Sequence, residues 1–234
     1  MGVGDNIDFK ASQWEFKGAV VDVFEEHVSK SVPLYFEAHN AILSLSDFFI
    51  KKCSICYDMG CSTGLLINKI AERHANKNAK FIGIDLECDM IKYAEKKYPN
   101  NNVSFINADI CNYDLTEASL IISYYTLQFI EYKYRSSLLK KIYDSLEPGG
   151  AFILYEKVYA ELSRFQDILN SVYFDFKVSN GYELNEVLSK SLSIRGVLNP
   201  NSTKENFKIL SDAGFTEVGV ISKYCNFEGY LAIK

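Results

Sequence analysis

The chain has 234 residues, 48% of them hydrophobic and only four of them proline, and its formal net charge at pH 7 is −5. This length suits one main domain with a small elaboration, and the composition excludes disordered and fibrous proteins. The negative charge opposes direct nucleic-acid binding, and the sequence has no apolar run long enough to cross a bilayer, so we expect neither partner.

The first 50 residues predict amphipathic helices, in which Val20, Val23, Phe24 and His27 share a face. From residue 51 short β-rich runs alternate with longer helical patterns, as in a doubly wound α/β sheet. Strands are expected at 55–58, 80–85, 103–108, 120–124 and 151–156, and helices at 64–75, 89–98 and 134–146. Pro148-Gly149-Gly150 predicts a turn between the last of these helices and the fifth strand.

After Lys157 the pattern changes to a helical cap studded with aromatic residues. Ser202-Thr203-Lys204-Glu205 then predicts a capping box that opens a helix ending at Gly214. Two strands follow at 217–222 and 227–233, close enough in sequence to be antiparallel. The chain therefore divides into an N-terminal helical lid (1–50), a Rossmann-like core (51–157), the cap (158–200), and a helix and strand pair that complete the core (201–234).

The loop Asp58-Met59-Gly60-Cys61-Ser62-Thr63-Gly64 joins the first predicted strand to a helix, where an open α/β sheet binds its ligand. Asp85 ends the second strand about 20 residues further on, where a carboxylate can accept hydrogen bonds from ribose hydroxyls. Asp109 ends the third strand in the same way, and with Ile110 it can hold an adenine ring. These acids predict a nucleoside site at one edge of the sheet.

The nature of the cofactor is inferred from the loop itself. The dinucleotide fingerprint G-x-G-x-x-G lets the main chain approach a pyrophosphate, but Cys61-Ser62-Thr63 stand between Gly60 and Gly64 and a third glycine is absent. An NAD-dependent oxidoreductase is therefore the weaker alternative. S-adenosyl-L-methionine has no phosphate and carries a sulfonium and an amino acid end, which suit the acidic Asp58. We predict S-adenosyl-L-methionine as the cofactor.

Several segments occur in order and at spacings that resemble class I S-adenosylmethionine-dependent methyltransferases and, more narrowly, the carboxy-S-adenosylmethionine synthase family. They are Trp14, Phe24, Ser31-Val32-Pro33 with Tyr35, the loop from Tyr57 to Ser62, Thr126-Leu127-Gln128-Phe129, Leu146-Glu147-Pro148-Gly149-Gly150, Asp175-Phe176-Lys177, Asn180-Gly181-Tyr182 and Ala213-Gly214-Phe215. The resemblance covers nearly the whole chain. It implies a seven-stranded, mostly parallel sheet with an antiparallel C-terminal strand, and a homodimer in which the cap reaches a neighbouring subunit.

Candidate cofactor-binding residues follow from the loop, the acidic strand ends and the resemblance. They are Tyr35, Asp58, Gly60, Cys61, Ser62, Asp85, Leu86, Met90, Asp109, Ile110 and Tyr124. Candidate substrate-binding residues are Tyr125, Lys177, Tyr182 and Arg195. No catalytic residue is singled out, because methyl transfer from a sulfonium mainly requires in-line placement in a dry pocket.

The resemblance also has two departures that bear on the reaction. Enzymes of the synthase family convert S-adenosylmethionine and prephenate to carboxy-S-adenosylmethionine, which is used to modify a wobble uridine of transfer RNA. The family's carboxylate-binding arginine aligns with Ser191, and its cofactor-facing asparagine aligns with Tyr124. Since a carboxylate would lose charge-assisted bonds there, we expect a methyltransferase with a small-molecule acceptor, including one that bears a carboxylate.

The sequence leaves alternatives for the carboxylate partner and for the function, and it indicates neither a metal site nor secretion. Arg195 lies one helical turn beyond Ser191, so a displaced carboxylate partner remains an option. Carboxy-S-adenosylmethionine synthase and a non-catalytic methyltransferase-fold partner remain alternative functions. The six cysteines are expected to be reduced, the pair Cys53 and Cys56 has no second pair or nearby His for a metal, and Asp5 and Asp8 favour a cytoplasmic protein over a secreted one.

Overall fold

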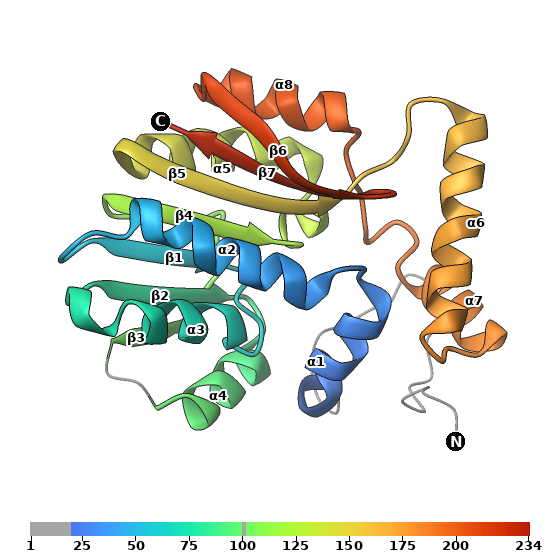
Figure 1. The fold of residues 1–234 in the computed structure, drawn as a ribbon, viewed down its shortest axis with the longest axis horizontal. Helices are drawn as coiled ribbons and strands as arrows, with labels where there is room; N and C mark the ends of the chain where they lie inside the picture. The colour runs from blue at the N-terminus through green and yellow to red at the C-terminus, as the bar shows by residue number, and fades with distance from the viewer. Residues whose placement is uncertain (1–19, 100–101) are drawn as a thin grey trace.

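The computed structural model describes residues 20–99 and 102–234, which form a seven-stranded sheet in the order β3-β2-β1-β4-β5-β7-β6 (Figure 1). Strands β1 to β5 run parallel, and β7 is antiparallel to both of its neighbours. The predicted mostly parallel sheet with an antiparallel C-terminal strand is therefore confirmed. The strands are β1 (Ile55–Met59), β2 (Lys80–Asp85), β3 (Val103–Asn107), β4 (Ala118–Tyr124), β5 (Leu146–Lys157), β6 (Glu217–Tyr224) and β7 (Phe227–Ile233).

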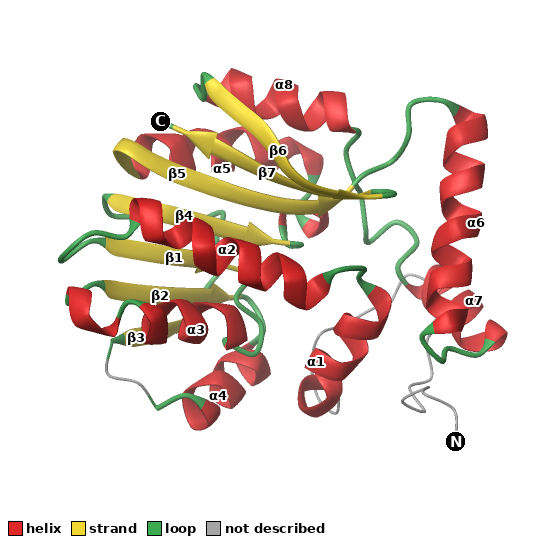
Figure 2. Ribbon diagram, in the orientation of Figure 1, coloured by secondary structure: helices red, strands yellow, loops and turns green. Residues whose placement is uncertain are grey.

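Helices cover both faces of the sheet (Figure 2). On one face, Ile42 of α2 and Ile67 of α3 pack in one buried cluster with strand residues. On the other, Leu139 of α5 and Leu210 of α8 pack in a second cluster. The helices are α1 (Val20–Ser31), α2 (Tyr35–Phe49), α3 (Leu65–Arg73), α4 (Cys88–Lys97), α5 (Tyr132–Ser145), α6 (Ser163–Ser179), α7 (Leu184–Ser193) and α8 (Thr203–Ala213), with single 3₁₀ turns η1 (Ala75–Lys77) and η2 (Leu127–Phe129).

The central strand β4 shows why this sequence forms a parallel sheet. Six consecutive residues from Ala118 to Ser123 are buried, and Ile121 and Ile122 are 0% exposed because helices lie on both sides. A near-continuous apolar run of this kind is typical of strands covered on both faces, whereas a strand with one solvated face alternates. The buried run fixes β4 at the centre of the sheet, next to the first strand.

Most element boundaries agree with the sequence predictions within a few residues, but the turn predicted at Pro148-Gly149-Gly150 is wrong. This segment belongs to β5, where the pairing with β4 shifts register between Leu146 opposite Ala118 and Ala151 opposite Leu120. Gly149 takes a φ of 76° and donates its N–H to the Lys234 oxygen, 2.8 Å away. The proline and glycines therefore form an irregular stretch of strand, stabilised by the end of the chain, which the local pattern could not reveal.

The helices α1, α6 and α7 stand beyond the carboxyl ends of the parallel strands (Figure 1). The predicted cap is helical, and the capping box at the start of α8 is confirmed by mutual bonds between Ser202 and Glu205. Within the predicted lid, α2 lies in the layer that covers the sheet, so α1 is the described helix that overhangs the strand ends. Trp14 lies outside the described residues. No helix of the described part is long and apolar enough to span a membrane.

Candidate functional site

A cavity of about 330 Å³ opens at the carboxyl ends of β1, β2 and β4. Its floor is the loop after β1, and its outer walls come from α1, α6 and α7. The described residues thus place the site at the switch point of the sheet, where parallel α/β folds bind ligands.

The loop that was predicted to bind the cofactor adopts a strained but well-bonded path. Gly60 and Gly64 take φ values of 79° and 77°, and Ser62 takes 51°. The N–H groups of Gly60 and Cys61 both donate to the Ile84 oxygen, at 2.8 and 3.0 Å. A Cβ on Gly64 would lie 2.6 Å from the Phe105 ring, so glycine is needed there for space as well as for φ.

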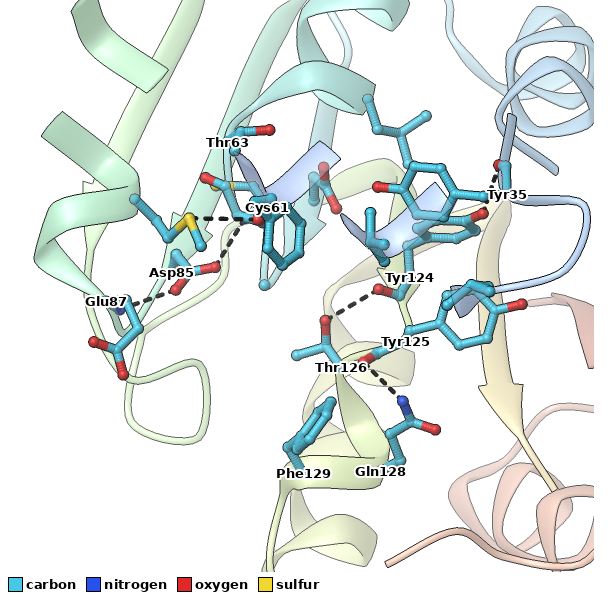
Figure 3. A pocket seen from close by; sticks show the side chains of 18 of the residues that line it. Tyr35, Cys61, Thr63, Asp85, Glu87, Tyr124, Tyr125, Thr126, Gln128 and Phe129 are labelled. Atoms are coloured by element: carbon cyan, nitrogen blue, oxygen red, sulfur yellow. Dashed lines mark hydrogen bonds between the residues drawn. The ribbon is translucent and has the colours of Figure 1, made fainter. Parts of the chain in front are cut away.

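Asp85 holds this loop and faces the cavity (Figure 3). Its carboxylate accepts the N–H of Ser62 at 2.8 Å and the N–H of Glu87 at 2.9 Å. Burial raises the pKa of Asp85, and these two main-chain donors oppose the shift. Since a carboxylate has about four lone-pair positions, Asp85 keeps acceptor capacity for a ribose diol.

Apolar side chains line the cavity beside Asp85. Leu86 lines the cavity with a side chain that is 67% exposed, while Met90 and Ile110 line it as buried groups. Asp109 also lines the cavity, but its two oxygens accept the Cys111 N–H at 2.8 Å and the Asn112 Nδ2 at 2.7 Å. Asp109 therefore shapes its own turn, and only its remaining lone pairs are open to a ligand.

Asp58, at the end of β1, is the most unusual acid of the site. It is 2% exposed, and its Oδ1 has no hydrogen-bond partner among the described residues. Burial, together with the charge of Asp85, raises the pKa of Asp58 to about 7. A buried and unsatisfied carboxylate is costly, so this position favours a cationic ligand group such as an ammonium or a sulfonium.

An aromatic cluster closes the cavity opposite Asp85 (Figure 3). Tyr124 donates its hydroxyl hydrogen to the main-chain oxygen of Tyr35 at 2.8 Å. Its ring contacts the rings of Tyr35, His39 and Tyr125 at centroid distances of 5.2, 4.8 and 4.8 Å. Burial raises the pKa of Tyr124 well above its ordinary value, which keeps it protonated. The hydroxyl hydrogen is therefore committed to the main chain.

Tyr125 links this cluster to the cap end of the cavity. It has a φ of 59°, which is rare for a non-glycine residue. Its main-chain oxygen accepts a hydrogen bond from the Gln128 Nε2 at 3.2 Å. The Oε1 of Gln128 in turn accepts the Lys157 N–H at 3.0 Å. The end of β4 and the end of β5 are thus joined through one amide side chain.

The lid helix α1 is fixed to the cofactor loop by an acid. Oε1 of Glu25 accepts the Thr63 hydroxyl at 2.9 Å and the Lys97 Nζ at 2.8 Å. Because α1 also contributes cavity-lining residues, this contact couples the position of the lid to the cofactor loop.

The cap end of the cavity is cationic. Lys157 and Lys190 line it, and Lys177 lies beside Lys157 with 4% of its side chain exposed. The Lys190 Nζ contacts the His27 Nε2, and the Tyr182 hydroxyl lies 3.2 Å from the His27 Nδ1. Burial, followed by the charges of Lys190 and Lys177, lowers the pKa of His27 to about 3, so this ring is neutral.

The sequence prediction and the structure differ in which cap residues reach the cavity. Tyr125 lines it, and Lys177 and Tyr182 are buried close to its cap end, whereas Arg195 and Ser191 are exposed and do not line it. Sequence reasoning did not identify Lys157 or Lys190 as cavity residues, nor His27 as a neutral ring that contacts the Lys190 ammonium. Lys157 was detectable in principle, as a lysine at the carboxyl end of a buried strand.

Across residues 20–99 and 102–234, no group of three or more His, Cys, Asp and Glu side chains is placed to hold a metal ion. All six cysteines are free thiols. Burial raises the pKa of Cys61, in the cofactor loop, well above its ordinary value, which keeps this thiol protonated.

Comparison with known proteins relates the chain to S-adenosylmethionine-dependent enzymes. A family model described as a methyltransferase domain matches residues 56–150. The chain is 39% identical to a carboxy-S-adenosyl-L-methionine synthase of Staphylococcus epidermidis, over 97% of this chain and 100% of that protein. It is 38% identical to a protein of the same name from Sulfurimonas denitrificans, over 99% of this chain and 100% of that protein.

Solved structures agree with the fold. The human N-acetylserotonin methyltransferase in complex with SAM superposes with a TM-score of 0.59 at 19% identity, covering 84% of this chain and 51% of that one. A SAM-dependent methyltransferase from Aquifex aeolicus gives 0.59 at 17% identity, covering 93% and 99%. At these identities the likeness concerns the fold alone.

Proposed function

Because the chain belongs to the carboxy-S-adenosyl-L-methionine synthase family, which shares the fold of S-adenosylmethionine-dependent methyltransferases, we propose that it binds S-adenosylmethionine and transfers its methyl group to a small-molecule acceptor. Asp85 would hold the ribose, Leu86, Met90 and Ile110 the adenine, and Asp58 would face the positively charged amino acid end. The buried Asp58 oxygen without a partner supports a cationic cofactor better than a pyrophosphate.

The observation that carries methyl transfer, rather than carboxyl transfer, is the state of Tyr124. Tyr124 occupies the position where the resemblance places a cofactor-facing asparagine. It donates its one hydroxyl hydrogen to the main-chain oxygen of Tyr35. It has no second donor for a carboxylate on the cofactor. Ser191, which aligns with the family's arginine, is exposed. Neither position supplies the charge-assisted bonds that a carboxymethyl sulfonium would need.

The chemistry required of the protein is then mostly placement. The acceptor forms a bond to the methyl carbon while the S–CH₃ bond breaks, the sulfur takes the electron pair, and an acceptor proton is lost to the surroundings. The bulky walls formed by Tyr35, Tyr124 and Tyr125 exclude water and align the acceptor with the methyl group. These tyrosines are protonated at neutral pH, since the ordinary tyrosine pKa is about 10 and burial raises the pKa of each further.

A second candidate is carboxy-S-adenosylmethionine synthesis from prephenate, favoured by the whole-length relatives that carry that name. One experiment separates the two. The protein is incubated with S-adenosylmethionine labelled with ¹³C in its methyl group, together with small acids that include prephenate, and the products are analysed by mass spectrometry. Methyl transfer gives S-adenosylhomocysteine and a labelled acceptor. Synthase activity leaves the labelled carbon on a carboxylated sulfonium and would refute methyl transfer.

Binding of S-adenosylhomocysteine by calorimetry tests the enzyme against the third alternative, a non-catalytic partner with a methyltransferase fold. A dissociation constant in the micromolar range supports an enzyme. The absence of binding at millimolar concentration would favour the scaffold role.

We further propose a cytoplasmic homodimer that has no nucleic-acid or membrane partner. The outer faces of α6 and α7 expose apolar side chains, with Phe165 and Leu188 both 59% exposed and Ile168 50% exposed. Exposed apolar patches on cap helices support an interface between two copies. Phe165→Glu with Leu188→Glu is expected to shift the mass measured by light scattering from dimer to monomer. A wild-type protein that is monomeric at assay concentration would refute the dimer.

A further inference from the structure

The charged groups around the cavity are sorted by sign. Asp58, Asp85 and Asp109 line its cofactor end. Lys157 and Lys190 line its cap end, with Lys177 close behind. The acidic end suits the cationic cofactor proposed above, so the cationic end is left for the second ligand, and this difference in sign predicts an anion.

Two of these cations have no anionic partner. The Lys157 Nζ lies 4.5 Å from the centroid of the Tyr173 ring and 5.9 Å from that of Phe227. The Lys177 Nζ lies 4.3 Å from the same Tyr173 centroid. Among the described residues, neither ammonium forms a hydrogen bond or an ion pair with a side-chain carboxylate. Lys190 differs, because its Nζ contacts His27 and donates to the Ser31 hydroxyl at 3.3 Å.

Aromatic contact alone does not account for this arrangement. The attraction between an ammonium and a ring is smaller than the cost of removing that ammonium from water. Here two ammonium groups share one ring, and their mutual repulsion adds to the cost. Burial lowers the pKa of both Lys157 and Lys177 to about 8, and the charge of Lys157 contributes to the shift of Lys177. A ligand anion in the cavity close to both ammonium groups would offset both costs.

Tyr173 holds the pair in place. Its hydroxyl donates to the main-chain oxygen of Ser31 in α1 at 2.8 Å, and its ring contacts the Phe227 ring at a centroid distance of 5.1 Å. The main chain of Lys157 is fixed through Gln128 to Tyr125. The lysines therefore come from two elements, β5 and α6, that are tied to the lid and to the acceptor side of the cofactor site.

We propose that Lys157 and Lys177 form an anion subsite that binds the carboxylate of the methyl acceptor, with the apolar body of the acceptor against Tyr125, Tyr173 and Phe227. This inference rests on the proposed function, since it concerns the second substrate of the same cavity. The carboxylate is bound by two ammonium groups, and the rest of the acid extends toward the methyl group of the cofactor.

The experiment measures ligand binding rather than turnover. Benzoate and malonate are titrated by calorimetry into protein saturated with S-adenosylhomocysteine, with benzamide as the uncharged analogue of benzoate and with inorganic phosphate as a second anion. Lys157→Met and Lys177→Met keep the length and apolar stem of each side chain while removing its charge. Lys208→Met is the matched control, because Lys208 is exposed and pairs with Asp212 on α8 at 2.7 Å.

We expect at least one carboxylate to bind wild-type protein and benzamide not to bind. Each cavity variant should weaken the carboxylate by about 10-fold or more, the loss of one charge-assisted contact, while Lys208→Met changes nothing. Lys157→Arg should retain part of the affinity. Affinity for S-adenosylhomocysteine should stay unchanged in every variant, which also shows that each variant is folded.

Three results would overturn the inference: carboxylate affinity unchanged in both cavity variants, equal binding of benzamide, or binding of phosphate alone. Absence of carboxylate binding to wild-type protein that binds S-adenosylhomocysteine would overturn it as well. Failure of the proposed function is distinguishable, because it is measured separately: the ¹³C-methyl experiment would then give a carboxylated sulfonium in place of S-adenosylhomocysteine and a labelled acceptor, or the wild-type protein would not bind S-adenosylhomocysteine.

Discussion

Replacing Asp85 by asparagine tests the cofactor site most directly. Two of the roughly four lone-pair positions of its carboxylate are occupied by the Ser62 and Glu87 N–H groups, at 2.8 and 2.9 Å. The carboxylate also faces the cavity, and its remaining acceptor capacity is what we propose for the ribose hydroxyls. Asp85→Asn removes the charge and one acceptor oxygen, so the ribose loses at least one charge-assisted bond of about 1.5 to 3 kcal/mol. The dissociation constant for S-adenosylhomocysteine should rise about 10- to 150-fold.

Isothermal calorimetry on purified protein measures this change. Asp212→Asn provides the matched control, because Asp212 lies on α8 in an exposed pair with Lys208. Equal affinities of wild-type and Asp85→Asn protein would refute the assignment of the ribose to Asp85. A comparable loss in Asp212→Asn would show that the effect is not specific to the cavity.

Three further predictions concern buried side chains in the site and in the surrounding core. The pKa of Asp58 is raised from 3.8 to about 7 in the folded chain. Between these values the folded chain retains a proton that the unfolded chain releases, so the free energy of unfolding falls as pH rises from about 4 through 7. Asp58→Asn should therefore flatten the fall in melting temperature of the ligand-free protein over this range, and a calorimetric profile parallel to that of the wild type would contradict the assignment. Tyr124→Phe should lower the free energy of unfolding by about 1 kcal/mol, because the hydrogen bond to Tyr35 is lost, and should leave turnover nearly unchanged. A turnover loss of about 100-fold, roughly 2.7 kcal/mol of activation free energy, would instead show that the hydroxyl is catalytic. Arg135 is 2% exposed and donates to four oxygen atoms, so Arg135→Met should lower the melting temperature by about 6 °C or more, and a fall below about 2 °C would mean that these acceptors find other donors.

The fold was predictable because the signals that define it are local. Buried runs such as Ala118 to Ser123 are long enough to mark central strands, and the capping box at Ser202 marks the start of α8. The stretch at Pro148 was not predictable. Its geometry depends on Lys234, which lies next to it only after the sheet has closed.

The acidic half of the site was also predictable, because parallel strands bring their carboxyl ends to one edge. Asp58 and Asp85 come directly from β1 and β2, so the strand pattern alone places them together. The burial of Asp58, which raises its pKa, depends on side chains from distant segments that surround it only in the folded chain, and no spacing rule provides this.

The cationic half depends on contacts between segments that are far apart in the chain, and this explains why Arg195 was considered and Lys157 was not. The helical spacing expected between Ser191 and Arg195 is wrong, because α7 ends at Ser193 and Arg195 lies in the turn that follows. Spacing also does not determine which face of the cap helices turns toward the sheet. That face is set by Tyr182, whose hydroxyl lies against His27 of α1. With α7 held in this way, Lys190 lines the cavity while Ser191, the next residue, is exposed. The packing of the cap on the lid therefore determines which cap side chains face the cavity.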